Sequence, residues 1–207
     1  MILFINACVR KGSRTKRLAD HLLQKLEGPV REVKLIDQAF PTADERFLLA
    51  REEQIQKGDF SHPAFGWARE FAEADTIVIA APFWDLSFPA VLKQYFEQIN
   101  VLGVTFTYTP EGLPRGLCQA QELYYVTTAG GPILSDEYGF GYVKAMAEGY
   151  YGIPRVCQIK AEGLDIQGAD AARLLREAEA DADALFPGTI PSYEDRSLYC
   201  HPPAFLG

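Results

Sequence analysis

The chain has 207 residues, of which 48% are hydrophobic and 23% charged, a composition typical of one soluble globular domain with a full core. The net charge of -8 at pH 7 argues against a broad nucleic-acid-binding surface, and no apolar run approaches the roughly 20 residues of a membrane span. The four cysteines are scattered without a Cys-x-x-Cys pair, so we expect a reduced, cytoplasmic protein with neither a metal site nor a disulfide framework.

The first part of the chain alternates apolar segments with helical patterns. Residues 2–5 predict a buried strand, and a helix follows over about 13–26. Residues 30–36 alternate in part and predict an edge strand. Residues 42–57 and 63–74 have the composition of two further helices.

The next strand organises the rest of the chain. Residues 77–81 form a continuous apolar run, typical of a strand buried on both faces of a parallel sheet. A helix begins near Pro89, and the glycines and prolines of 103–117 then predict an excursion over the surface. The remaining predicted elements are a strand at 123–128, a helix at 139–151, a strand at 156–160 and a helix over about 171–185.

These elements predict one domain over residues 1–186, followed by an irregular tail at 187–207 that lacks periodicity. Five strands alternating with helices predict an α/β fold with a doubly wound parallel sheet. The flavodoxin-like strand order 2-1-3-4-5, with helices on both faces, places the loops after the first and third strands side by side, where ligands bind.

The loop after the first strand predicts an anion site. Ser13 and Thr15 add hydroxyl donors at the start of a helix, where free N–H groups and the helix dipole favour an anion. The dinucleotide and P-loop fingerprints are absent, so the expected ligand is a phosphate ester of another kind. Five cations lie within eight residues of this loop, namely Arg10, Lys11, Arg14, Lys16 and Arg17.

The loop after the strand at 77–81 contains four bulky apolar side chains: Phe83, Trp84, Leu86 and Phe88. At the carboxyl end of a parallel strand, such a loop suits a flat conjugated ligand. Together the two loops predict a monophosphate on a flat ring system, flavin mononucleotide (FMN). The alternative, in which these side chains only pack the loop onto its neighbours, stays open.

A second interpretation of the first loop is a phosphatase. Cys8, Arg14 and Thr15 satisfy C-x5-R-[ST], the phosphate loop of cysteine phosphatases, in the strand–loop–helix setting of the low-molecular-weight tyrosine phosphatases. There a thiolate attacks phosphorus and the arginine binds the equatorial oxygens. The late acid loop of those enzymes has no counterpart here.

Four parts of the chain resemble one family. Residues 13–15 (SRT) resemble its S-x-S phosphate loop, and 81–89 (APFWDLSFP) with 92–96 (LKQYF) resemble A-P-M-Y-N-F-x-x-P-x-x-L-K-x-Y-F. Residues 103–108 (GVTFTY) match G-x-T-F-x-Y, and 128–131 (TAGG) take the place of S-R-G-G. The chain thus resembles the FMN-dependent NAD(P)H quinone reductases and azoreductases of flavodoxin-like fold.

The resemblance implies a homodimeric enzyme. NADH or NADPH would reduce FMN and leave before an aromatic acceptor (a quinone, azo compound or nitroaromatic) binds, in a ping-pong sequence. The flavin carries the chemistry, so no catalytic acid or base is expected. The phosphate would lie on Ser13, Arg14 and Thr15, assisted by Arg10. The ring would lie on Pro82, Phe83, Trp84, Asp85 and Leu86 and on Thr128, Ala129, Gly130 and Gly131.

Three residues depart from the family pattern: Asp85 replaces an asparagine, Ala129 replaces an arginine and Trp84 replaces a tyrosine. Because two of these changes alter charge, FMN binding is better supported than a particular acceptor. A flavodoxin-type electron carrier is the second alternative, although flavodoxins generally lack an excursion like 103–117.

Overall fold

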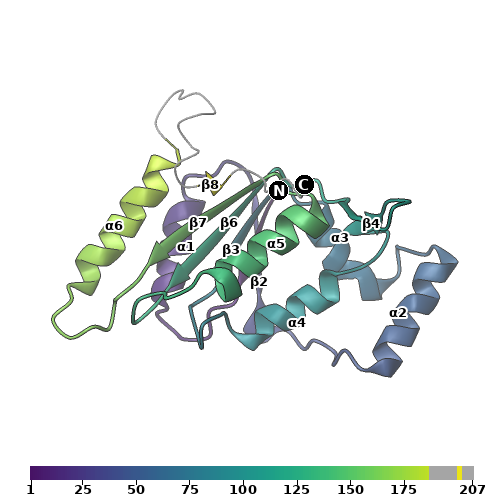
Figure 1. Cartoon of the computed structure of the whole chain (residues 1–207), viewed down its shortest axis with the longest axis horizontal. Helices are drawn as coiled ribbons and strands as arrows, with labels where there is room; N and C mark the ends of the chain where they lie inside the picture. Colours follow the sequence, from purple (N-terminus) through teal and green to yellow (C-terminus); the bar gives the residue numbers. More distant parts are fainter. Residues whose placement is uncertain (187–199, 202–207) are drawn as a thin grey trace.

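The computed structural model describes residues 1–186 and 200–201, and all structural statements refer to these residues. A twisted sheet crosses the centre of the molecule, with helices on both faces (Figure 1). The strand order is β2-β1-β3-β6-β7-β8, and the first five strands are parallel, which confirms the predicted order 2-1-3-4-5. The strands are β1 (Ile2–Asn6), β2 (Val30–Lys34), β3 (Thr76–Ala80), β6 (Glu122–Thr128), β7 (Arg155–Ala161) and the short antiparallel β8 (Cys200–His201).

The helices bury two separate hydrophobic cores against the sheet. One core combines the inner faces of α1 and α6 with one face of the sheet, and includes Leu18, Leu22 and Leu175. The other lies under α3, α4 and α5 and includes Phe71 and Tyr95. The helices are α1 (Arg14–Leu23), α2 (Glu45–Lys57), α3 (Gly66–Ala72), α4 (Ala90–Ile99), α5 (Tyr142–Met146) and α6 (Ala171–Ala184), with short 3₁₀ turns η1 (Leu35–Asp37) and η2 (Pro63–Phe65).

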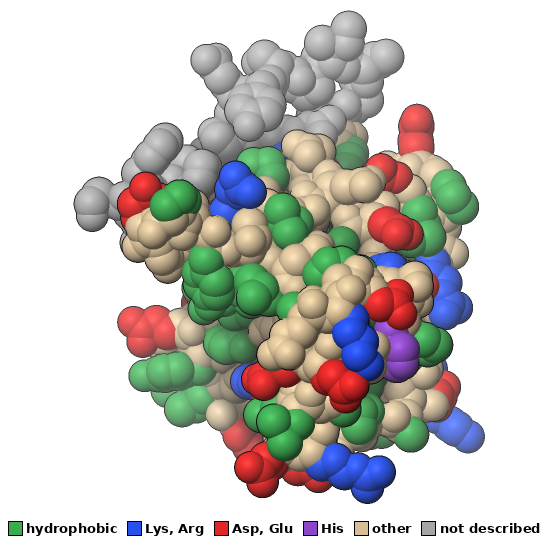
Figure 2. Space-filling model, turned by 90° about the vertical axis from the view of Figure 1, so that its right-hand side faces the viewer, with side chains coloured by type: hydrophobic (Ala, Val, Ile, Leu, Met, Phe, Trp, Pro, Cys, Tyr) green, Lys and Arg blue, Asp and Glu red, His purple; other side chains and the backbone are tan. Residues whose placement is uncertain are grey.

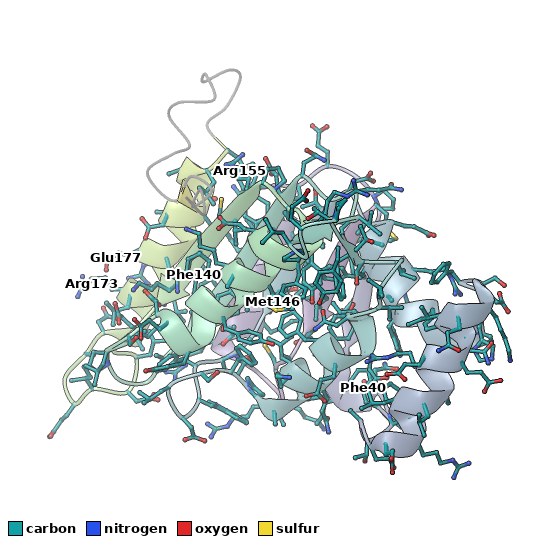
Figure 3. All side chains as sticks on the ribbon, turned by 45° about the vertical axis from the view of Figure 1, so that its right-hand side comes forward. Phe40, Phe140, Met146, Arg155, Arg173 and Glu177 are labelled. Atoms are coloured by element: carbon teal, nitrogen blue, oxygen red, sulfur yellow. The ribbon has the colours of Figure 1, made fainter. Side chains whose placement is uncertain are left out.

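The predicted helix at 139–151 exists with an irregular backbone. Two π-helical turns, η3 (Glu137–Gly141) and η4 (Ala147–Tyr151), flank α5. Figure 3 shows Phe140 and Met146 on this segment, in front of the sheet. The buried ring of Phe140 packs 6.0 Å from that of Tyr125 in β6, measured between centroids. π-Helical turns are frequent near functional sites, and η3 follows directly on the loop after β6.

Helix α2 lies at the end of the molecule farthest from α6 (Figure 1), and none of its residues is buried. Figure 2 shows the face that carries it, where acidic and basic side chains are interspersed with hydrophobic ones. Its contacts with the rest of the chain include Ile55, which packs against the core, and Arg51, which donates to the carbonyl of Glu97 in α4 at 2.9 Å; local interactions also stabilise it. The side chain of Asp44 accepts a hydrogen bond from the N–H of Phe47 at 2.8 Å, and Lys57 pairs with Glu53 one turn away.

The later part of the chain adds two elements and corrects one expectation. The predicted surface excursion contains a hairpin of β4 (Phe106–Tyr108) and β5 (Pro114–Gly116). Two residues of the predicted irregular tail form β8, while 187–199 and 202–207 lie outside the described residues. Cys157, whose partner in the strand register is Cys200, is disulfide-bonded, so the expectation of reduced cysteines without a disulfide is wrong. No helix in the described part is both long and apolar enough to cross a bilayer.

Candidate cofactor site

Loops that are far apart in the sequence meet at the carboxyl edge of the sheet. Because β1, β3, β6 and β7 are parallel, the loops that follow them emerge at the same edge. They surround a cavity of about 420 Å³. Its lining residues are Val9, Arg10, Lys11, Gly12, Ser13, Arg14, Thr15, Pro82, Phe83, Trp84, Thr128, Gly130 and Asp165.

The structure thus brings together most of the residues that the sequence predicts to bind a cofactor. Four of the predicted residues do not line this cavity. Asp85 and Leu86 are exposed in the loop after β3, the aromatic loop of residues 82–89. Ala129 is buried, and Gly131 is exposed beside Gly130.

The first loop forms a cradle of free backbone donors. Within the described part of the chain, none of the N–H groups of residues 9–15 donates a hydrogen bond to a protein acceptor. Gly12 has a φ of 73°, which lets the backbone turn here. Ser13 caps α1 by accepting a hydrogen bond from the N–H of Lys16 at 3.3 Å, and its side chain also interacts with that of Cys8. A series of unpaired N–H groups at a helix start favours an anion.

The Arg14 side chain has protein partners within the site. Its guanidinium forms an ion pair with Asp165 at 2.9 Å and donates to the carbonyl of Leu164 at 3.2 Å. Arg14 therefore contacts the loop after β7 through both terminal nitrogens of its guanidinium while it also lines the cavity.

Only part of the positive charge in the first loop is free. Lys16 pairs with a carboxylate one turn along α1, and Arg17 pairs with Glu179 at 2.9 Å. Arg10 and Lys11 make no ion pair with any described residue, and both line the cavity. These two cations are the ones that remain to neutralise an anion.

A buried hydrogen bond joins the first loop to the end of β6. The hydroxyl oxygens of Thr15 and Thr128 lie 2.6 Å apart, and the two residues are only 1% and 8% exposed. Thr15 was predicted as a hydroxyl donor to phosphate, but its side chain is engaged with Thr128. Its contribution to the site is therefore the backbone N–H and the contact between two loops.

The aromatic loop after β3 contains a tight turn in an unusual conformation. The backbones of Trp84 and Ser87 exchange hydrogen bonds of 3.0 and 2.8 Å. Between them, Asp85 and Leu86 have φ values of 50° and 66°, the left-handed region that favours glycine. The Ser87 hydroxyl donates to the carbonyl of Tyr138 at 2.5 Å, which ties the turn to η3. Strained residues of this kind cluster at binding sites.

The loop after β6 offers two backbone donors to the cavity edge. Its carbonyl groups accept hydrogen bonds from the loop after β7: Leu164 N–H to Ala129 O at 3.2 Å and Asp165 N–H to Gly130 O at 2.8 Å. Within the described residues, the N–H groups of Gly130 and Gly131 donate to no protein acceptor. A Cβ on Gly130 would overlap the carboxylate of Asp165, which would then have to shift.

Sequence reasoning missed the loop after β7, which contributes Asp165. The available signal was topological, because this loop follows the fifth strand at the same edge of the sheet as the predicted site. The residues of this loop are of the types found in any strand-to-helix turn, so they do not single it out as part of a site.

The surroundings of Cys8 do not suit a phosphatase. Its side chain is only 5% exposed, its Sγ lies 3.8 Å from the carbonyl oxygen of Ala80, and burial raises the pKa of the thiol. A nucleophilic cysteine needs the opposite, an exposed thiol of lowered pKa. The arginine of the motif, Arg14, is turned toward Asp165. The cysteine phosphatase alternative is therefore not favoured.

Comparison with known proteins agrees with this architecture. A family described as having a flavodoxin-like fold matches residues 1–186. An FMN-dependent NADH:quinone oxidoreductase of Lachnoclostridium phytofermentans is 36% identical over 193 residues, covering 87% of this chain and 95% of that protein. An enzyme of the same name from Clostridium beijerinckii is 33% identical over 186 residues, covering 86% and 93%.

Among solved structures, an azoreductase from Bacillus anthracis superposes with a TM-score of 0.75 at 25% identity, covering 87% of this chain and 95% of the azoreductase. The family match spans nearly all of the described residues, and the relatives are covered almost from end to end. The chain therefore belongs to the family of flavodoxin-like fold that includes the FMN-dependent NADH:quinone oxidoreductases.

Proposed function

We propose that this chain is an oxidoreductase that binds FMN in the cavity at the carboxyl edge of the sheet and transfers reducing equivalents from NADH to quinones or azo compounds. One observation carries the proposal. A single cavity of about 420 Å³ has unpaired backbone donors and free cations at one part of its wall and aromatic side chains at another.

The donor-rich wall fits the phosphate of FMN. A phosphate monoester presents several acceptor oxygens and nearly two negative charges at neutral pH. The unpaired N–H groups of residues 9–15, the hydroxyl of Ser13 and the charges of Arg10 and Lys11 meet both requirements. The charge of Arg14 is not needed, since Asp165 already neutralises it.

The other walls fit a flat heteroaromatic ring. Phe83 and Trp84 line the cavity and can pack on a ring face, while the N–H groups of Gly130 and Gly131 can donate to acceptor atoms along a ring edge. The hydrogen bond from the Phe83 N–H to the Thr128 carbonyl, 3.0 Å long, keeps these walls adjacent.

The protein supplies position, field and exclusion of water. When bound, FMN supplies the hydride chemistry, which no side chain in the cavity provides. The cradle at residues 9–15 anchors the phosphate, the aromatic turn covers the ring from water, and the glycine loop orients the ring edge. No residue is assigned as a catalytic acid or base.

Several finer parts of the proposal follow the family resemblance. They are the use of NADPH as well as NADH, a ping-pong sequence, nitroaromatic acceptors, a homodimer whose partner copy completes the acceptor pocket, and a cytoplasmic location. We also propose that residues 1–186 form the FMN-binding domain and that residues 187–207 form a C-terminal tail, of which Cys200 and His201 pair with β7.

Anaerobic stopped-flow spectroscopy tests the proposal. The purified protein loaded with FMN is mixed with NADH, and the flavin absorbance is expected to bleach within the turnover time and to recover on addition of a quinone. An electron carrier of the flavodoxin type would leave the flavin oxidised in excess NADH. A preparation that binds no added FMN would contradict the proposal itself.

A further inference from the structure

We propose that Arg14 and Asp165 form a charge pair that sets the redox potential of the bound cofactor, with each residue shifting the potential in the opposite direction. This inference rests on the proposed binding of FMN. It assigns to both side chains a function other than phosphate binding or overall stability.

The pair lies where two loops of the site meet. The guanidinium of Arg14, at the start of α1, contacts the carboxylate of Asp165 at 2.9 Å and the carbonyl of Leu164 at 3.2 Å. The backbone N–H of Asp165 in turn donates to the carbonyl of Gly130 at 2.8 Å. The two charges therefore lie beside the loop after β6, in which Gly130 and Gly131 have free N–H groups.

Asp165 stands apart from the other residues around the cavity. It is the one carboxylate among the described residues that line it, whereas Arg10 and Lys11 are free cations of the same lining. Its carboxylate lies so close to Gly130 that even a methyl group there would overlap it. A ring held by the N–H groups of Gly130 and Gly131 would therefore share the cavity with this carboxylate.

Stability does not account for the pair. The side chains of Arg14 and Asp165 are 36% and 66% exposed, and exposed ion pairs of this kind contribute little to folding. A ring that fills the cavity displaces water from beside the pair, and the same charges then act through a medium of lower dielectric constant. Their effect is thus expected on the ligand rather than on the fold.

The sign of each effect follows from electrostatics. Reduction adds electron density to the flavin ring, so a nearby negative charge disfavours the reduced form and a positive charge favours it. Removing the charge of Asp165 leaves Arg14 uncompensated and is expected to raise the potential. Removing the charge of Arg14 leaves Asp165 uncompensated and is expected to lower it.

The test is the midpoint potential of FMN bound to four proteins at saturating FMN: the parent, Asp165→Asn, Arg14→Gln and the double variant. Asp165→Asn should favour the reduced form by about tenfold, equal to about 30 mV for a two-electron couple. Arg14→Gln should shift the potential by a similar amount downward, and the double variant should lie between the two. Opposite signs separate this role from a structural one, which would impair the site in the same way in both single variants.

A matched control comes from the next arginine on α1. Arg17 pairs with Glu179 at 2.9 Å, and neither side chain lines the cavity. Glu179→Gln should leave the potential unchanged. Shifts of the same sign in both variants, no shift in Asp165→Asn, or an equal shift in Glu179→Gln would overturn the inference. If the parent protein binds no FMN, the proposed function fails instead.

Discussion

The buried contact between Thr15 and Thr128 gives a quantitative prediction about how the site is assembled. Their hydroxyl oxygens are 2.6 Å apart, and both residues are buried. Thr15→Val and Thr128→Val each keep the shape of the side chain but leave the opposite hydroxyl buried without its partner. Replacing both residues removes the pair together and leaves no orphaned hydroxyl.

The expected magnitudes differ because an unpaired buried hydroxyl costs more than a lost hydrogen bond. Each single variant should lower the free energy of unfolding by about 1–3 kcal/mol, whereas the double variant should be nearly neutral. For a domain of this size, about 1 kcal/mol corresponds to a shift in Tm of about 2–4 °C. The two substitutions should therefore be strongly non-additive.

Urea unfolding of the FMN-free protein measures this double-mutant cycle. The slopes of the four unfolding curves should agree, so that differences in midpoint report differences in stability. The reasoning is refuted if the effect of the double variant equals the sum of the single effects within about 0.5 kcal/mol. Additivity would mean that α1 and the end of β6 are not in contact, and that the cavity is not built as described.

Three further predictions concern the ring site and the partly buried thiol of Cys118. Trp84→Ala should weaken FMN binding by about 1–3 kcal/mol, by analogy with aromatic stacking on bases, as measured by quenching of flavin fluorescence; an unchanged Kd would remove Trp84 from the site. Gly130→Ala should displace the Asp165 carboxylate and weaken FMN binding by about 1–3 kcal/mol, whereas exposed Gly131→Ala should have a smaller effect. Burial raises the pKa of Cys118 from 9.0 to about 12, so its contribution to stability is present below pH 9 and is lost as the pH rises toward 12. Urea unfolding between pH 8 and 11 should show a smaller alkaline loss in Cys118→Ala, and equal losses would contradict the assignment.

The order of the parallel sheet could be predicted because it depends on local patterns. Continuous apolar runs such as 77–81 mark buried strands, and their alternation with helices leaves few topologies. The same patterns identified the first loop and the aromatic loop as neighbours at one edge. The partners of individual side chains could not be predicted in this way, since Arg14 pairs with a carboxylate about 150 residues along the chain.

The conformation of the aromatic turn was also beyond sequence reasoning. Two-residue turns with two left-handed residues usually carry asparagine, aspartate or glycine followed by glycine, and this chain has Leu86 in place of the glycine. The surroundings impose the conformation, in part through the hydrogen bond from Ser87 to Tyr138. Local propensity fails here because the turn forms part of the candidate site.

Titration of the FMN-free protein with FMN, in parallel with Ser13→Asp, tests the central claim most directly. The account predicts saturable binding with one FMN per chain in the parent protein. It also predicts a loss of at least about tenfold in affinity when a carboxylate is placed beside the phosphate cradle. A parent protein that binds no FMN, or a Ser13→Asp variant that binds it with unchanged affinity, would contradict the account.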